Sequence, residues 1–303
     1  MSKLIIGIHG LANKPEKSLQ EQWWKESIAE GLRKNCGART SATDIPLVAV
    51  YWASRLYKSP LHQDNNYDFD DQFDDEPYVQ GPATFQTYND GWLDSLRSRT
   101  LNVLGSALDL LRKHTDIDVV SSFLMAKIVR DLHFYYDPNR TLPANGQRRP
   151  AAEVLQGDLS AALRANAQHE IMLIAHSMGT IISYDVLRNL GAPDQGIRVP
   201  HFVTIGSPLG LPSVKDHIGV KRGKVRTPSI VTKSWTNFAD RRDVVALDTH
   251  LSDDFDKNGA DVKVKDDLVL NEYTNGKKGN PHKLYGYLRA PEVSKHIWAF
   301  LQG

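Results

Sequence analysis

One serine of the sequence stands between a run of apolar residues and a helical pattern, a setting that suits a nucleophile. Ser177 follows the apolar residues 171–175 and precedes the amphipathic residues 178–190. A strand that turns sharply into a helix holds a serine in a strained conformation, with its hydroxyl projecting above the sheet edge. Gly179 permits the close approach of strand and helix that this turn needs. The pattern predicts a nucleophilic Ser177, with a serine that merely caps a buried helix as the structural alternative.

Four short segments, one of which contains Ser177, resemble the sequence of a known protein family. They are residues 5–11 (IIGIHGL), 175–179 (AHSMG), 204–209 (TIGSPL) and 237–246 (NFADRRDVVA). Together they resemble the lipase and esterase branch of the α/β-hydrolase superfamily, in which some bacterial lipases also carry alanine at the first position of the serine turn. The resemblance runs from residue 4 to about residue 300 and leaves out residues 55–149. It implies an α/β-hydrolase fold, a catalytic triad and an acyl-enzyme mechanism that uses no cofactor and no metal.

The resemblance implies that the triad follows the chain order serine, acid, histidine. His282 lies in a turn-rich segment, residues 278–283, directly before the last helical pattern. A loop after the last strand is where this fold presents its general base. We therefore expect His282 to be the base, with His250 as the alternative.

Three aspartates, Asp240, Asp243 and Asp248, follow an expected strand over residues 231–238. The acid of a triad accepts a hydrogen bond from the far imidazole nitrogen and fixes its tautomer. Aspartate followed by two valines is the pattern of lipases, which favours Asp243. Asp240, which is closer to the end of the strand, is the alternative, and an aspartate that is not used has a simple role in the turn.

Two backbone N–H groups are expected to bind the oxyanion that forms during attack on a carbonyl. The N–H of Met178 lies at the start of a helix, where it points toward a developing negative charge. The resemblance places the second donor in the segment from His9 to Leu11, at the backbone of Leu11. Gly10 lets the backbone come close to a substrate. We expect His9 to be a structural hydrogen-bonding residue at the base of this loop.

Short apolar runs alternate with longer helical patterns along most of the chain, which predicts an α/β fold with a mostly parallel central sheet and helices on both faces. The expected strands are residues 4–8, 46–52, 171–175, 201–205 and 231–238. The expected helices include residues 19–33, 151–165, 178–190 and 291–301.

Residues 55–149 break this alternation. One helical pattern places Leu101, Leu104, Leu108 and Leu111 on one face, and a second begins near Val119 and runs to Tyr135. We interpret residues 55–149 as a mostly helical cap or lid inserted into a hydrolase core of residues 1–54 and 150–303; a plain structural layer is the alternative. The apolar faces of the insertion favour a lipid-like or long-chain ester as substrate.

Composition limits the remaining functions. The formal net charge is +1, which excludes a strong field for nucleic acid, and no stretch approaches the roughly 18 apolar residues of a membrane span. A single cysteine, Cys36, excludes an intramolecular disulfide framework. We therefore expect a cytoplasmic enzyme, with export without a classical signal as the alternative, that cleaves a small-molecule or lipid-like ester and has at most peripheral contact with lipid. An acyltransferase, a thioesterase and a non-catalytic binding protein of the same fold stay open, as does the oligomeric state.

Overall fold

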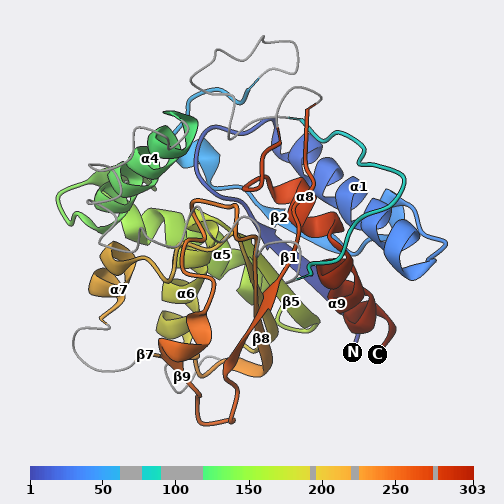
Figure 1. Ribbon diagram of the computed structural model, residues 1–303. Coiled ribbons are helices and arrows are strands. Elements are labelled where there is room, and N and C mark those ends of the chain that lie inside the picture. The colour runs from blue at the N-terminus through green and yellow to red at the C-terminus, as the bar shows by residue number, and fades with distance from the viewer. Residues whose placement is uncertain (62–76, 90–118, 192–195, 220–224, 276–278) are drawn as a thin grey trace.

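Six parallel strands form the central sheet of the protein, as a computed structural model describes it for residues 1–61, 77–89, 119–191, 196–219, 225–275 and 279–303 (Figure 1). The strand order is β10-β8-β6-β5-β1-β2. The strands are β1 (Lys3–Ile8), β2 (Leu47–Val50), β5 (Glu170–His176), β6 (Val199–Ile205), β8 (Val231–Ala239) and β10 (Val264–Leu268). The expected mostly parallel α/β architecture is confirmed.

Helices cover both faces of this sheet (Figure 1). One layer consists of α1 (Lys17–Cys36), α8 (Leu284–Arg289) and α9 (Pro291–Gln302), which contact one another. The other consists of α4 (Val119–Tyr136), α5 (Ala151–Ala165), α6 (Met178–Leu190) and α7 (Pro212–Ile218). Neighbouring residues of β1 point to opposite faces: Ile5 packs into the core beneath α1, α8 and α9, and Ile6 packs into the core beneath α5 and α6.

The five expected strands and the expected helices over residues 19–33, 151–165, 178–190 and 291–301 are present, with ends that differ by a few residues. β10 was not expected because its residues 265–267 are charged. The strand lies at the edge of the sheet, where charged side chains are tolerated because one side of the strand faces solvent. The short helices α7 and α8 were not expected either. The smaller elements are η1 (Ala42–Asp44), η2 (Ala53–Arg55), β7 (Val225–Arg226), η4 (Leu251–Asp253) and β9 (Phe255–Asp256).

The inserted residues 55–149 are described in part. The second expected helix is α4, whose buried residues Ile128, Leu132 and Tyr135 belong to the core beneath α5 and α6. An antiparallel hairpin of β3 (Thr141–Ala144) and β4 (Gln147–Pro150) follows, and its turn residues Asn145 and Gly146 both have positive φ. An Asn-Gly pair is the local signal for such a turn, but no hairpin was expected here.

Other expectations about this insertion stay open. The helical pattern of Leu101, Leu104, Leu108 and Leu111 lies outside the described residues. The division of the chain into a core and a cap therefore remains a prediction. In the part of the chain that the structure describes, no helix has the length and apolar character needed to cross a membrane.

The strand order reverses between β1 and β5, because the chain first adds β2 on one side and later returns to build β5, β6, β8 and β10 on the other. In an open parallel sheet, ligands bind outside the carboxyl ends of the strands at such a point of reversal. The segment from His9 to Leu11 follows β1, and Ser177 follows β5. The fold therefore brings these two predicted segments to the same edge.

Candidate active site

Ser177 occupies a sharp turn between β5 and α6. Its φ of 53° and ψ of −129° lie in a region that residues other than glycine rarely adopt, at a cost of about 1–3 kcal/mol. The surroundings hold it there: its N–H donates to the carbonyl of Ile205 (3.2 Å), and its carbonyl accepts from the N–H (2.9 Å) and hydroxyl (2.7 Å) of Thr180. A Cβ at Gly179 would lie 2.6 Å from the carbonyl oxygen of His9, so this close approach requires glycine.

The hydroxyl of Ser177 begins a chain of hydrogen bonds. Nε2 of His282 lies 3.0 Å from Oγ of Ser177, and Nδ1 lies 2.9 and 2.8 Å from the two carboxylate oxygens of Asp243. All three residues are buried: Ser177 is 3% exposed, His282 is 5% exposed and Asp243 is 1% exposed. This geometry allows the imidazole to accept the serine proton on one nitrogen while the other donates to the carboxylate. The structure thus brings together the three residues chosen from the sequence.

Two further donors surround the carboxylate of Asp243. The N–H of Val245 donates to Oδ1 (2.9 Å), and the hydroxyl of Tyr287 donates to Oδ2 (2.8 Å). Burial raises the pKa of Tyr287 well above its ordinary value, and the charge of Asp243 raises it further. The phenol therefore stays protonated and remains a donor. Tyr287 also accepts a hydrogen bond from the N–H of Asp240 (3.0 Å), which ties α8 to the loop after β8.

The alternative acid and base are engaged elsewhere. Asp240 accepts two hydrogen bonds from the guanidinium of Arg242 (3.0 and 2.6 Å) and one from the backbone N–H of Asn271 (2.7 Å). Nδ1 of His250 lies 3.0 Å from the hydroxyl oxygen of Thr249. Among the described residues, Asp243 is therefore the carboxylate that meets His282.

The loop that carries His282 is held by a residue that the sequence did not single out. The side-chain amide of Asn271 donates to the carbonyls of Pro281 (2.8 Å) and Lys283 (2.7 Å), on either side of His282. The backbone N–H of Asn271 is the one that binds Asp240. Because Asn271 follows the unexpected edge strand β10, no local pattern marks it.

His176, directly before Ser177, is a second residue of the site that the sequence patterns do not single out. Its Nε2 lies 2.8 Å from the carbonyl oxygen of His282, and the two imidazole rings are 4.7 Å apart. Burial lowers the pKa of His176 well below its ordinary value, and the neighbouring His282 lowers it further. A neutral His176 with its proton on Nε2 donates to that carbonyl and holds the backbone of His282. A histidine directly before the candidate nucleophile is the signal that could have identified it.

The loop after β1 lies against the serine. A Cβ at Gly10 would be 2.6 Å from Cβ of Ser177, so the backbone before Leu11 passes directly beside the nucleophile. His9 stabilises the base of this loop: its Nε2 accepts from the N–H of Trp52 (3.2 Å), and its Nδ1 lies 2.7 Å from the carbonyl oxygen of Gly10. Burial lowers the pKa of His9 to about 3, which keeps the ring neutral.

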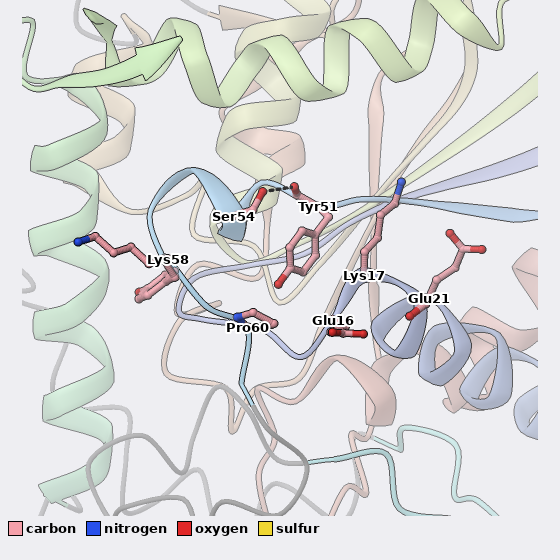
Figure 2. Close-up of a pocket in the computed structure, with 9 residues that line it drawn as sticks. Glu16, Lys17, Glu21, Tyr51, Ser54, Lys58 and Pro60 are labelled. Carbon is pink, nitrogen blue, oxygen red and sulfur yellow. Dashed lines mark hydrogen bonds between the residues drawn. The ribbon is translucent and has the colours of Figure 1, made fainter. Parts of the chain in front are cut away.

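The residues that the structure describes line cavities on and near this site. A pocket of about 30 Å³ is lined by Ser177 and His282, and a cavity of about 460 Å³ has Leu11 and Met178, the two expected oxyanion donors, in its wall. The larger part of the exposed wall of this cavity is apolar and includes Trp52, Leu56, Phe134 and Leu155, and charged side chains also line it: Arg130, Asp131, Asp137 and Arg140. A third, open cavity of about 740 Å³ shares no lining residue with the pocket at Ser177; its wall includes Glu16, Lys17, Glu21, Tyr51, Ser54, Lys58 and Pro60 (Figure 2).

Within the described residues, no group of three or more His, Cys, Asp and Glu side chains is placed to hold a metal ion. Compared with models of protein families, with curated proteins and with solved structures, the chain gives no match. The fold defines it as an α/β protein with a parallel sheet. Its candidate site is a buried Ser–His–Asp arrangement at the carboxyl edge of that sheet.

Proposed function

We propose that the protein is a serine hydrolase of the lipase and esterase branch of the α/β-hydrolase superfamily, and that it cleaves carboxylic esters. The observation that carries this proposal is the buried chain of hydrogen bonds from Ser177 through His282 to Asp243, with distances of 3.0 Å and 2.8 Å. The strained φ of the serine and its position at the reversal of strand order support the same conclusion.

The proposed reaction uses the three triad residues and the two backbone donors. Nε2 of His282 takes the proton of Ser177 as Oγ attacks the ester carbonyl carbon, and Asp243 stabilises the resulting imidazolium. The N–H groups of Leu11 and Met178 bind the oxyanion. His282 then protonates the leaving alcohol, and an acyl-enzyme remains on Ser177. Water, deprotonated by the same nitrogen, attacks this ester, and the acid product leaves as Ser177 regains its proton.

The cavity of about 460 Å³ beside Leu11 and Met178 suits the larger part of the substrate. Ligand pockets of this size, with mostly apolar walls, bind small molecules, which favours a small-molecule or lipid-like ester. Transfer of the acyl group to an acceptor other than water, cleavage of a thioester, and a binding role without catalysis are the competing functions. The cytoplasmic location stays a prediction.

A fluorophosphonate probe tests the proposal directly, because it labels an activated serine. We expect labelling of the native protein and none of Ser177→Ala, with ester hydrolysis lowered by about 10⁴-fold or more. Ser183→Ala is the matched control. Its hydroxyl is buried in α6 and has no hydrogen-bond partner among the described residues, so its removal should leave labelling intact.

Three measurements distinguish the proposed function from its alternatives and narrow the substrate. Labelling that persists in Ser177→Ala, or that is absent from the native protein, would contradict the proposed nucleophile, and absence would favour a binding role. A panel of p-nitrophenyl esters of rising chain length separates a short-chain esterase from a lipase. Faster release of the acyl group on addition of glycerol would favour an acyltransferase.

A further inference from the structure

The two cavities at the candidate site differ in size and meet at one residue. Leu11, whose N–H is the expected second oxyanion donor, belongs to the walls of both. The pocket of about 30 Å³ also has His282 in its wall. The described wall of the cavity of about 460 Å³ has Met178 and not His282. An ester whose carbonyl oxygen lies at Leu11 therefore has one side toward His282 and the other toward the larger cavity.

The proposed reaction determines which side of the ester faces His282. After attack by Oγ of Ser177, the former carbonyl carbon carries Oγ, the oxyanion, the alkoxy group and the acyl chain. Nε2 of His282, which lies 3.0 Å from Oγ, must pass its proton to the alkoxy oxygen so that the C–O bond breaks and the alcohol leaves. The alkoxy group therefore lies on the side of His282, and the acyl chain lies on the opposite side, toward the cavity beside Met178.

One wall of the larger cavity is held in place by a buried carboxylate. α4 contributes Phe134 and Tyr135 to this wall. The hydroxyls of Tyr135 and Tyr136 donate to Oδ2 of Asp185 in α6 (3.0 and 3.1 Å). Gln156 of α5 donates to the hydroxyl of Tyr135 (2.7 Å). The cavity is therefore bounded by side chains whose positions are fixed before a substrate binds, as is usual for ligand pockets.

The charged side chains of this wall form pairs of opposite sign. Nε of Arg130 lies 3.1 Å from Oδ1 of Asp131. Nε of Arg140 lies 3.6 Å from Oδ2 of Asp137. The two pairs contribute no net charge, and the arginine side chains are 71% and 63% exposed. The buried part of the wall is apolar and includes Leu11, Trp52, Leu155 and Met178.

We infer that the cavity of about 460 Å³ binds the acyl chain of the substrate and that the pocket of about 30 Å³ receives a small alkoxy group. The inference rests on the proposed function. One water molecule needs about 10–15 Å³, so the small pocket has room for a methyl or ethyl group, and a longer alkyl chain extends beyond it. The substrate class is therefore the ester of an apolar carboxylic acid with methanol or ethanol. Water cleaves it to the free acid and the small alcohol.

Methyl octanoate and heptyl acetate form a matched pair of substrates, because they are isomers with the long chain on opposite sides of the ester. The rate of acid release gives kcat/KM for each, with Ser177→Ala as the background. Division by the rate of alkaline hydrolysis of each ester removes the difference in intrinsic reactivity. A buried methylene group is worth about fourfold, so with several in the cavity we expect the corrected kcat/KM to favour methyl octanoate by about 100-fold or more.

Two variants of the cavity wall test where the acyl chain lies. Leu56→Trp fills part of the cavity, and Phe134→Ala removes part of its apolar wall. Each should lower the ratio of kcat/KM for methyl octanoate to kcat/KM for methyl acetate by about tenfold, the effect of one or two methylene contacts. Leu301→Trp is the matched control. Leu301 is partly buried like Leu56 but packs against the core beneath α1, α8 and α9, so this variant should keep the ratio.

Labelling of Ser177 by the fluorophosphonate keeps the two proposals distinguishable. With Ser177 labelled normally, equal corrected kcat/KM for the two isomers, or a preference for heptyl acetate, would overturn the assignment of the acyl chain and leave the serine hydrolase standing. An unchanged ratio in both wall variants would also overturn this assignment. A protein that neither labels nor hydrolyses either ester would overturn both proposals. If one wall variant fails to fold, the ratio measured for the other decides.

Discussion

The phenol of Tyr287 and the imidazole of His282 share one carboxylate oxygen: Oδ2 of Asp243 lies 2.8 Å from each. Tyr287 belongs to α8, and His282 lies in the loop that leads into this helix. The position of α8 therefore determines where both the phenol of Tyr287 and the imidazole of His282 meet the carboxylate of Asp243. Because Oδ2 accepts from two donors, the orientation of the carboxylate toward the imidazole depends on Tyr287 as well as on the backbone of Asp243.

Removing the phenol hydroxyl tests this dependence. Tyr287→Phe loses the hydrogen bond to the carboxylate of Asp243 and the one accepted from the N–H of Asp240. From the loss at the carboxylate we expect kcat/KM to fall by about tenfold, the equivalent of about 1.4 kcal/mol. The matched control is Tyr184→Phe, since the hydroxyl of Tyr184 donates to the carbonyl of Arg226 (2.9 Å) away from the triad. Urea unfolding should show a loss of stability in both variants, larger for Tyr287→Phe because its hydroxyl makes two hydrogen bonds and that of Tyr184 makes one among the described residues. A fall in kcat/KM of the same size in both would mean that Tyr287 acts through stability alone.

Asn271 offers a sharper comparison, because the chain holds a second buried asparagine with the same arrangement. The amide of Asn258 donates to the carbonyls of Pro228 (3.0 Å) and Val231 (2.8 Å), as Asn271 does to those on either side of His282. Each alanine variant loses these two donated hydrogen bonds and also those that its Oδ1 accepts, one from the N–H of Tyr273 for Asn271 and two from the N–H groups of Ala260 and Val262 for Asn258. We therefore expect both to be destabilised by about 3–4 kcal/mol in urea.

Under conditions where both asparagine variants are fully folded, we expect only Asn271→Ala to lower kcat/KM, by about 100-fold, because misplacing a general base by about 1 Å costs that much. The rate of fluorophosphonate labelling should fall in parallel. Native kcat/KM in folded Asn271→Ala would show that His282 is positioned without this clamp.

Candidate site residues can be predicted from the sequence where their immediate neighbours in the chain form a recognisable pattern. Ser177 was found from the strand before it and the helix after it, and Asp243 from the valines that follow. Asn271 and Tyr287 carry no such signal, since each acts through a tertiary contact with another loop. His176 is marked only by its place directly before Ser177, and its role also depends on a tertiary contact with the loop of His282. β10 was missed for a related reason: its charged residues are acceptable only at a sheet edge, and its position there is a property of the whole fold.

Gly10 tests how closely the loop after β1 must approach the nucleophile. A Cβ at this position would lie 2.6 Å from Cβ of Ser177, so Gly10→Ala must displace either the loop or the serine. We expect kcat/KM to fall by about 100-fold, since small displacements of reacting groups are costly. Gly157→Ala is the control, because nothing lies within 4 Å of the added Cβ. It should stabilise α5 by about 0.5–1 kcal/mol without changing kcat/KM. Undiminished kcat/KM in Gly10→Ala would contradict the proposed position of the oxyanion loop.

The last prediction concerns the buried carboxylate of Glu30, in α1. Its oxygens accept from Nζ of Lys34 (2.5 Å), the hydroxyl of Tyr78 (2.9 Å) and the N–H of Gly81 (2.8 Å), and Arg289 lies 3.3 Å away. Burial alone would raise the pKa of Glu30, but these donors and the charge of Arg289 outweigh it, and the pKa lies below its ordinary value of 4.5.

A carboxyl with a lowered pKa in the folded state stabilises the protein above its ordinary pKa, and this contribution is lost as the pH falls through the lowered value. Glu30→Gln keeps the shape and removes the charge, which leaves Arg289 without its ionic partner. We expect the free energy of unfolding at neutral pH to fall by about 3 kcal/mol. Urea unfolding between pH 7 and pH 3 should show the difference between the native protein and the variant shrink below about pH 4.5, as the unfolded native chain takes up a proton at Glu30. A difference that stays constant over this range would mean that the charge of Glu30 contributes nothing to stability.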